Sequence, residues 1–188
     1  DASAVISAGE VHQLMVSHDL GITHEVYEQV ISAKTAALFA AASEIGAVVA
    51  GKPEWQKNLR DYGQALGMAF QLVDDALDYQ ASEADLGKAI GDDFRDGKVT
   101  LPVILAYADA TSEEKKFWRA ALDAGESLSV ENLTRAKKLM LKHNSFDRTL
   151  KVAREFANAA CAAIAQFPTS PAKAAMLEAA EFAVGRGF

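Results

Sequence analysis

No stretch of this 188-residue chain alternates apolar and polar residues as a half-buried strand would, and its apolar residues recur at helical spacing. Alanine, the best helix former, is abundant, and only four prolines interrupt the pattern. The sequence therefore predicts an all-α fold, a bundle of mostly antiparallel helices. No repeat, low-complexity segment or linker divides it, so we expect residues 1–188 to form a single domain.

Capping and breaking residues set the expected helix boundaries. Thr23 and the pair Ser170-Pro171 are N-terminal signals, Thr111 with Glu114 has the spacing of a capping box, and Gly51-Lys52-Pro53 ends one helix and opens the next. Between residues 34 and 44 the second helix is almost entirely apolar, which predicts burial on all sides. Expected helices cover residues 1–18, 23–50, 53–79, a short segment after 102, one beginning near 112, 130–143, 146–166 and 171–185.

Composition limits the classes of function. The formal charge is −7 and no basic stripe is present, so binding to nucleic acid is not expected. The single cysteine, Cys161, lies among alanines and is interpreted as a small buried hydrophobe rather than a nucleophile, which suits a reducing cytoplasmic setting. No apolar run has transmembrane length and no signal peptide is recognisable, so we expect no transmembrane segment.

Three aspartates lie near the end of the third expected helix. Gln71, Asp74, Asp75 and Asp78 are spaced i, i+3, i+4 and i+7, which places them on one stripe. Carboxylates at this spacing repel one another by about 0.2–0.5 kcal/mol per pair, and the negative end of the helix dipole adds to the cost. A solvated acidic face is one interpretation. The apolar residues around the stripe favour the other, a magnesium site formed by Asp74, Asp75 and Asp78.

Lysines and glycines form the second signal. Lys34 lies in an apolar stretch, so its ammonium must either reach solvent along its own stem or meet an anion. Residues 87–102 contain Lys88, Lys98 and three glycines, a composition that suits phosphate, although the spacing excludes a Walker A loop. Residues 92–96 (Asp-Asp-Phe-Arg-Asp) are predicted to be mainly loop because glycines surround them, with Asp93 near the metal. The four histidines, His12, His18, His24 and His143, have no partners at metal-ligand spacing and are expected to be surface or satisfied residues.

Taken together, these stretches resemble the trans-polyprenyl diphosphate synthases over residues 5–110, and the remainder matches only as helices. Residues 34–42 resemble the long-chain members that make octaprenyl to decaprenyl side chains of quinones. The motifs that carry the resemblance are Gly9-Glu10 with Gln13-Leu14, Lys34-Thr35, Phe70-Gln71 with Asp74-Asp75 and Asp78, and Gly87-Lys88 with Gly91, Asp93, Gly97-Lys98 and Thr100-Leu101-Pro102.

The resemblance implies an isoprenoid-synthase-like fold and a prenyltransferase that condenses isopentenyl diphosphate with an allylic diphosphate. In the family, Mg²⁺ neutralises the diphosphate so that the allylic carbon–oxygen bond ionises. It also implies a homodimer that uses residues 36–49 and a transient membrane contact for product release. The implied site residues are Asp74 and Asp78 with Asp75 assisting for metal, Lys34, Lys88 and Lys98 for diphosphate, Gln13 and Asp93 in the substrate site, and Thr35 and Gln71 as oxygen dipoles directed at the cation.

One departure from the family pattern is large. The family's first aspartate-rich motif, and the basic residues that bind isopentenyl diphosphate, have no counterpart in these 188 residues. We therefore expect a C-terminal part of a synthase, with N-terminal helices missing, about half of the active site present and no activity on its own.

Three alternatives stay open. A terpene cyclase relative would also ionise an allylic diphosphate, but the Gly-Lys loop with Thr100-Leu101-Pro102 argues against it. A non-catalytic subunit of a heteromeric synthase would not need the lysines and aspartates intact. A helical-bundle binding protein with a structural metal would not need lysines for diphosphate.

Overall fold

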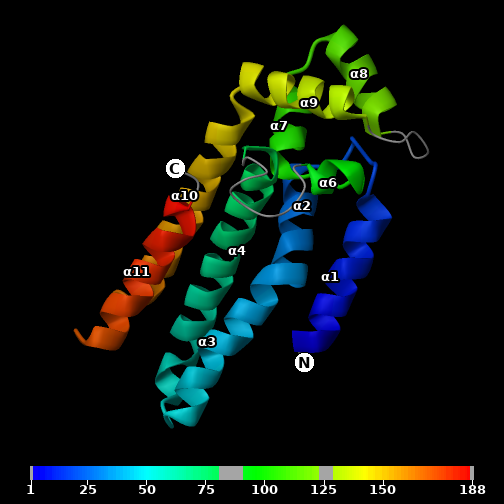
Figure 1. Ribbon diagram of the computed structural model, residues 1–188. Coiled ribbons are helices and arrows are strands. Elements are labelled where there is room, and N and C mark those ends of the chain that lie inside the picture. Colours follow the sequence, from blue (N-terminus) through cyan, green and yellow to red (C-terminus); the bar gives the residue numbers. More distant parts are fainter. Residues whose placement is uncertain (1, 81–90, 123–128, 187–188) are drawn as a thin grey trace.

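The computed structural model describes residues 2–80, 91–122 and 129–186, and every regular element in these ranges is helical (Figure 1). The all-α prediction is confirmed. In chain order the elements are α1 (Ala2–Val16), α2 (His24–Ile31), the π-helical turn η1 (Ser32–Ala36), α3 (Ala37–Val49), the 3₁₀ turn η2 (Pro53–Trp55), α4 (Gln56–Gln80), α6 (Asp92–Arg95), α7 (Leu101–Ala108), α8 (Ser112–Leu122), α9 (Val130–Lys142), α10 (Ser145–Ala163) and α11 (Pro171–Gly185).

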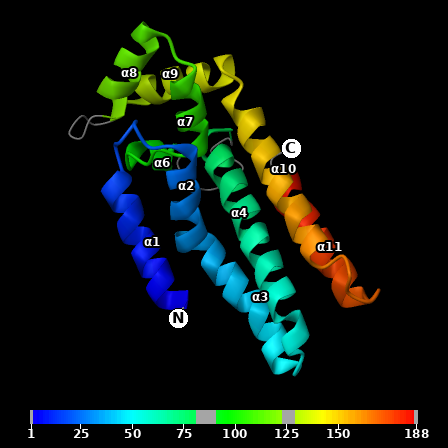
Figure 2. The same ribbon diagram turned by 180° about the vertical axis from the view of Figure 1, so that it is seen from behind.

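The long helix α4 is the centre of the bundle. The helices α3 and α10 pack antiparallel to it, α11 folds back along α10, and α1 lies beside α2 and η1 (Figures 1 and 2). The shorter helices α6 to α9 gather at the end of the bundle where α4 finishes and α2 begins. Buried side chains of α4 contribute to three successive apolar clusters along its length. The central helix thus holds the C-terminal hairpin on one side and the α1–α3 layer on the other.

The predicted helix signals are used as the sequence indicates. The Thr23 hydroxyl accepts the Val26 amide at 3.3 Å. The Thr111 amide donates to the Glu114 carboxylate at 2.8 Å, while the Glu114 amide donates to the Thr111 hydroxyl at 3.3 Å, which completes the capping box. Helix α11 begins in the same way, because the Ser170 hydroxyl accepts the Lys173 amide.

The second predicted helix is continuous from His24 to Val49, but it contains the π turn η1, which the sequence did not indicate. Burial of residues 34–44 on all sides was also predicted, and this is wrong for the described chain. The inner residues Ala36 and Ala40 are buried, whereas Leu38 is 56% exposed. The exposed face continues along α3 through Ile45, Val48 and Val49.

The same helix qualifies the expectation that no apolar run has transmembrane length. By length and composition alone, the 26 residues His24–Val49 form one helix apolar enough to cross a membrane. A core helix of a water-soluble protein passes the same test, so the finding is weak evidence for a span. Only 28% of its most apolar window is buried, which leaves a broad apolar face open to a partner.

Helix α4 approaches η1 and α3 closely because it has glycine at the points of contact. A Cβ atom on Gly67 would lie 2.6 Å from Ala36 Cα, and one on Gly63 would lie 2.3 Å from the Phe39 carbonyl oxygen. Both neighbours are backbone atoms, which cannot rotate away as a flexible side chain would. These two contacts therefore fix the distance and register between α4 and η1, and with them the position of the polar side chains of α4 that face η1.

We expect Gly67→Ala to lower the free energy of unfolding by about 1–3 kcal/mol, the usual cost of overpacking, even though alanine favours the helix by about 1 kcal/mol. Gly46→Ala in α3 is the matched control, because its added Cβ would meet only Leu59 Cδ1, at 3.9 Å. Chemical denaturation of both variants measures the difference. Equal stability of the two would contradict the close-approach argument.

Candidate functional site

The π turn η1 places Lys34 against α1. Gly9 is the buried contact on α1, since an added Cβ would lie 2.5 Å from the Lys34 backbone nitrogen. The Lys34 ammonium donates to Gln13 Oε1 at 2.5 Å and pairs with Glu10 Oε2 at 3.0 Å. Its side chain stays 28% exposed. The structure thus fits both sequence interpretations of Lys34, because the ammonium pairs with an acidic side chain and the residue also remains partly exposed to solvent.

The next residue, Thr35, begins a chain of hydrogen bonds into α4. The Thr35 hydroxyl donates to Gln71 Oε1 at 2.8 Å, and Gln71 Nε2 donates to Asp75 Oδ1 at 2.7 Å. The other Asp75 oxygen accepts the Tyr27 hydroxyl at 2.6 Å. Because Asp75 engages the amide nitrogen of Gln71, the amide oxygen is directed toward Thr35. Tyr27 was not identified from the sequence, where nothing marks it as more than an apolar residue of α2.

The three stripe aspartates differ in environment. Asp74 is exposed, whereas Asp75 is 2% exposed and has both oxygens hydrogen-bonded within the protein. Burial, and then the negative charge of Asp93, raise the pKa of Asp75 to about 8. The same two causes raise the pKa of the half-buried Asp78 to about 6. Burial, more than repulsion between carboxylates, thus makes the ionised forms of Asp75 and Asp78 unfavourable.

Asp78 connects α4 to the segment that follows. Its two carboxylate oxygens accept the amides of Asp92 and Asp93, each at 3.2 Å, and its carbonyl accepts the Gly91 amide at 2.9 Å. Residues 92–96 were predicted to be mainly loop, and this is wrong for Asp92–Arg95, which form the single helical turn α6. The carboxylate of Asp78 satisfies amides at the start of that turn, a cap that is distant in sequence.

Lys98 lies just beyond α6. Its ammonium donates to Asp93 Oδ1 at 2.9 Å and pairs with Asp96 Oδ2 at 3.0 Å. Burial opposes the charged form of Lys98, but the hydrogen bonds to Asp93 and Asp96 outweigh it and raise its pKa. Lys98 is thus a fixed positive charge beside the acidic end of α4. Its predicted companion Lys88 lies outside the described residues.

The predicted residues therefore form two adjoining groups. Elements α1, η1 and α4 bring together Gln13, Lys34, Thr35 and Gln71, while α4 and α6 bring together Asp78, Asp93 and Lys98. Across residues 2–80, 91–122 and 129–186, no three histidine, cysteine, aspartate or glutamate side chains meet as a metal-binding cluster. Together the two groups contain lysines in ion pairs with carboxylates, hydroxyl and amide dipoles, and acidic side chains.

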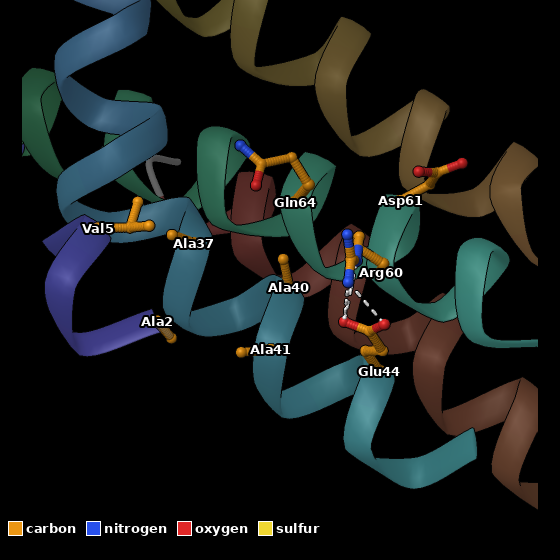
Figure 3. A pocket seen from close by; sticks show the side chains of 9 residues that line it. All are labelled: Ala2, Val5, Ala37, Ala40, Ala41, Glu44, Arg60, Asp61 and Gln64. Atoms are coloured by element: carbon orange, nitrogen blue, oxygen red, sulfur yellow. Dashed lines mark hydrogen bonds and ion pairs between the residues drawn. The ribbon is translucent and has the colours of Figure 1, made fainter. Parts of the chain in front are cut away.

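An open groove of about 420 Å³ runs between α1, α3 and α4 (Figure 3). Small side chains form much of its wall, and an ion pair stands at one end, where Arg60 donates to Glu44 at 2.9 and 2.7 Å. From Lys34 to Glu44 is ten residues of helix, or about 15 Å at 1.5 Å per residue. The groove is lined by Ala2, Val5, Ala37, Ala40, Ala41, Glu44, Arg60, Asp61 and Gln64.

The protein is thus an all-α bundle with lysines and aspartates on neighbouring helices. Comparison with known proteins identifies the family to which such a bundle belongs. The polyprenyl synthetase family matches residues 1–140. The chain therefore belongs to the polyprenyl synthetase family.

Individual relatives agree with this assignment. Octaprenyl diphosphate synthase of Escherichia coli (strain K12) is 42% identical over 187 residues, which cover 99% of this chain and 57% of that protein. All-trans-nonaprenyl-diphosphate synthase of Rhodobacter capsulatus is 35% identical and is matched over 55% of its length. The chain thus spans little more than half the length of these relatives.

Solved structures show the same fold. A decaprenyl diphosphate synthase from Rhodobacter capsulatus superposes with a TM-score of 0.92 at 42% identity, over 100% of this chain and 57% of that one. A polyprenyl synthase from Caulobacter crescentus CB15, solved with calcium and isoprenyl diphosphate, gives 0.94 at 49% identity over the same shares. The predicted isoprenoid-synthase-like fold and the predicted family are confirmed.

Proposed function

We propose that the intact protein is a magnesium-dependent prenyltransferase that condenses isopentenyl diphosphate with an allylic diphosphate into a long-chain trans-polyprenyl diphosphate. The observation that carries this proposal is the meeting of Lys34 and Thr35 on η1 with Gln71 on α4, next to the Asp78–α6–Lys98 group. Relatives named octaprenyl and nonaprenyl diphosphate synthases, and the Caulobacter structure with isoprenyl diphosphate, support the substrate class. Residues 1–188 would be the C-terminal portion of one cytoplasmic, all-α synthase domain.

The acidic end of α4 suits magnesium. Hard carboxylate oxygens are its preferred protein ligands, and one or two carboxylates with substrate phosphates usually suffice. Burial, and then the negative charge of Asp93, raise the pKa of Asp78, and a bound cation would offset both effects. Asp74 and Asp78 would hold the ion, and bound Mg²⁺ supplies charge neutralisation for a leaving diphosphate. The calcium in the Caulobacter structure is consistent with a divalent-cation site in a relative.

We assign Asp75 to a different role from the one expected at first. Asp75 is 2% exposed and its oxygens accept from Tyr27 and Gln71, so it would orient the Gln71 amide, whereas Asp78 is only partly buried. That orientation uses the Thr35 proton in the bond to Gln71 and leaves the Thr35 lone pairs available. Thr35 would then present an oxygen dipole to an allylic cation, preorganised before the substrate binds.

Lysines would hold the diphosphate. Lys34 and Lys98 are each partly exposed and already fixed by carboxylates, so each can add a phosphate oxygen to its remaining ammonium protons. Lys88, together with Gln13 and Asp93, would complete this side of the substrate site. The groove in Figure 3 would accept the apolar chain, because its alanine-rich wall leaves room where larger side chains would fill it.

In the intact protein, calorimetry should detect Mg²⁺-dependent binding of inorganic diphosphate. Asp74→Ala with Asp78→Ala should abolish it, because carboxylate oxygens that hold the cation are lost. Asp75→Asn is the matched control and should retain most of the affinity, since Asp75 is buried and isosteric replacement keeps the packing. Equal binding by the double variant would rule out the metal site proposed for Asp74 and Asp78.

The 188-residue chain alone should not elongate prenyl diphosphates, whereas the intact enzyme should. Among the described residues only α4 carries an aspartate stripe on a long helix, and the isopentenyl diphosphate site has no counterpart in the sequence. Correct positioning of two reactants can contribute about 7–11 kcal/mol of the barrier reduction, so its loss should leave no measurable turnover. The measurement uses labelled isopentenyl diphosphate, an allylic primer and magnesium. Elongation by the short chain above a no-protein control would contradict this.

Activity of the intact protein only with a second, different polypeptide would support the heteromeric-subunit alternative.

We also propose a homodimer that uses the outer face of α3. Four large apolar residues of this face, Leu38, Ile45, Val48 and Val49, are exposed, and burying such a patch in an interface is favourable. Ile45→Glu with Val48→Glu should shift the intact protein toward monomer by burying unpaired charge in the interface. Sedimentation at micromolar concentration measures this, and Val130→Glu on α9 is a control at an exposed apolar residue remote from α3. A monomeric unmodified protein would count against the interface.

A further inference from the structure

His18 lies where three segments meet, just beyond the end of α1. Its backbone amide donates to the Gly97 carbonyl at 2.8 Å, and its ring nitrogen Nδ1 is 2.8 Å from the carbonyl of Leu122, the last residue of α8. A carbonyl can only accept, so Nδ1 carries the proton. One residue thus joins α1 to the turn after α6 and to the end of α8.

The backbone of His18 indicates that this contact has a cost. Its φ is +65°, a left-handed conformation that residues with a Cβ adopt infrequently and that glycine or asparagine usually supplies after a helix. A histidine there contributes a ring that neither of those residues has. That ring covers Gly97.

Gly97 is shaped to receive the ring. It is buried, its φ is +69°, and an added Cβ would lie 2.0 Å from His18 Cε1 and 2.3 Å from Nε2. Lys98 follows directly, and its amide donates to the Asp93 carbonyl at 2.9 Å. The peptide unit that His18 holds is therefore the one that leads from α6 into Lys98.

The α6 turn is anchored from two sides. On one side, Asp78 of α4 accepts the amides of Asp92 and Asp93. On the other, His18 holds Gly97, and α1, which leads into His18, also carries Gln13 and its contact to Lys34. A single helix thus controls the placement of both lysines of the site, Lys34 along its length and Lys98 beyond its end.

We propose that His18 is a positioning residue that acts through Gly97 to place the Lys98 ammonium for diphosphate. The proposal rests on the diphosphate-binding role assigned to Lys98 above. The competing explanation is an ordinary helix C-terminus whose ring happens to lie on Gly97. The two differ in what removal of the ring should do.

The decisive variant is His18→Gly in the intact protein. Glycine relieves the left-handed backbone, which offsets the lost bond to the Leu122 carbonyl, so thermal unfolding should occur at about the same temperature. Affinity for inorganic diphosphate with Mg²⁺ should nevertheless fall about tenfold, the scale of one hydrogen bond to a charged group. The KM for the allylic substrate should rise with it. Unchanged affinity in a variant of equal stability would overturn the proposal and leave only the capping explanation.

His18→Asn is the conservative comparison. Asparagine tolerates the left-handed backbone, and its amide can still donate to the Leu122 carbonyl. It should therefore recover a large part of the lost affinity, and an affinity no better than that of His18→Gly would contradict the role of the Leu122 bond. Hydrogen exchange of the amides of residues 91–100 gives a readout that needs no ligand, and exchange should quicken in His18→Gly. If the unmodified protein failed to bind diphosphate, the proposed function would fail. The exchange data would still decide whether His18 orders the segment, because unchanged exchange overturns that role.

Discussion

The close packing of η1 between α1 and α4 is the constraint on which the site depends. On one side Gly9 of α1 touches the backbone of Lys34, and on the other Gly67 of α4 touches Ala36. Neither contact leaves space for a Cβ atom, so the distances from η1 to its neighbours are set by backbone rather than by adjustable side chains. The η1 side chains consequently contact partners at fixed positions: Lys34 contacts Gln13, and Thr35 contacts Gln71. A π turn, which widens the helix locally and is frequent at functional sites, lies where two polar residues have to face two different helices.

How much of this could be predicted from the sequence depends on whether the determinants are local. The ends of α2, α8 and α11 follow from capping residues within three positions of the cap, and these predictions are confirmed. The turn α6 was missed because nearby glycines disfavour a helix, while its cap comes from Asp78, fourteen residues earlier, and its anchor Phe94 is buried against Trp118. The π turn was missed for the same kind of reason, since it follows from packing between helices that are distant in sequence.

Within the aspartate stripe the limit of the sequence argument is geometric. Residues 74 and 75 are adjacent, so on a helix their side chains point about 100° apart, and one stripe cannot give both the same environment. The spacing predicted one stripe of Gln71, Asp74, Asp75 and Asp78. In the structure Gln71 bonds to Asp75, Asp78 bonds to the start of α6, and Asp74 is exposed. It could not say that Asp75 would turn inward to Tyr27, because that partner lies on α2 and carries no signal of its own. The stripe thus combines one buried, one partly buried and one exposed aspartate.

The balance of charge at the end of α4 supports the proposal that the site binds a divalent cation together with diphosphate. At the end of α4, Asp78 accepts the Asp93 amide, Lys98 pairs with the Asp93 carboxylate, and Asp74 lies exposed one turn earlier. Lys34 is already paired with Glu10. A diphosphate would add further negative charge, so two lysines alone could not hold it against these carboxylates. Burial, and then the charge of Asp93, raise the pKa of Asp78, so a nearby positive charge would favour its ionised form. In the proposed function, a divalent cation held by Asp74 and Asp78 would offset this repulsion and favour diphosphate binding. The arrangement should thus bind cation and diphosphate together far better than either alone.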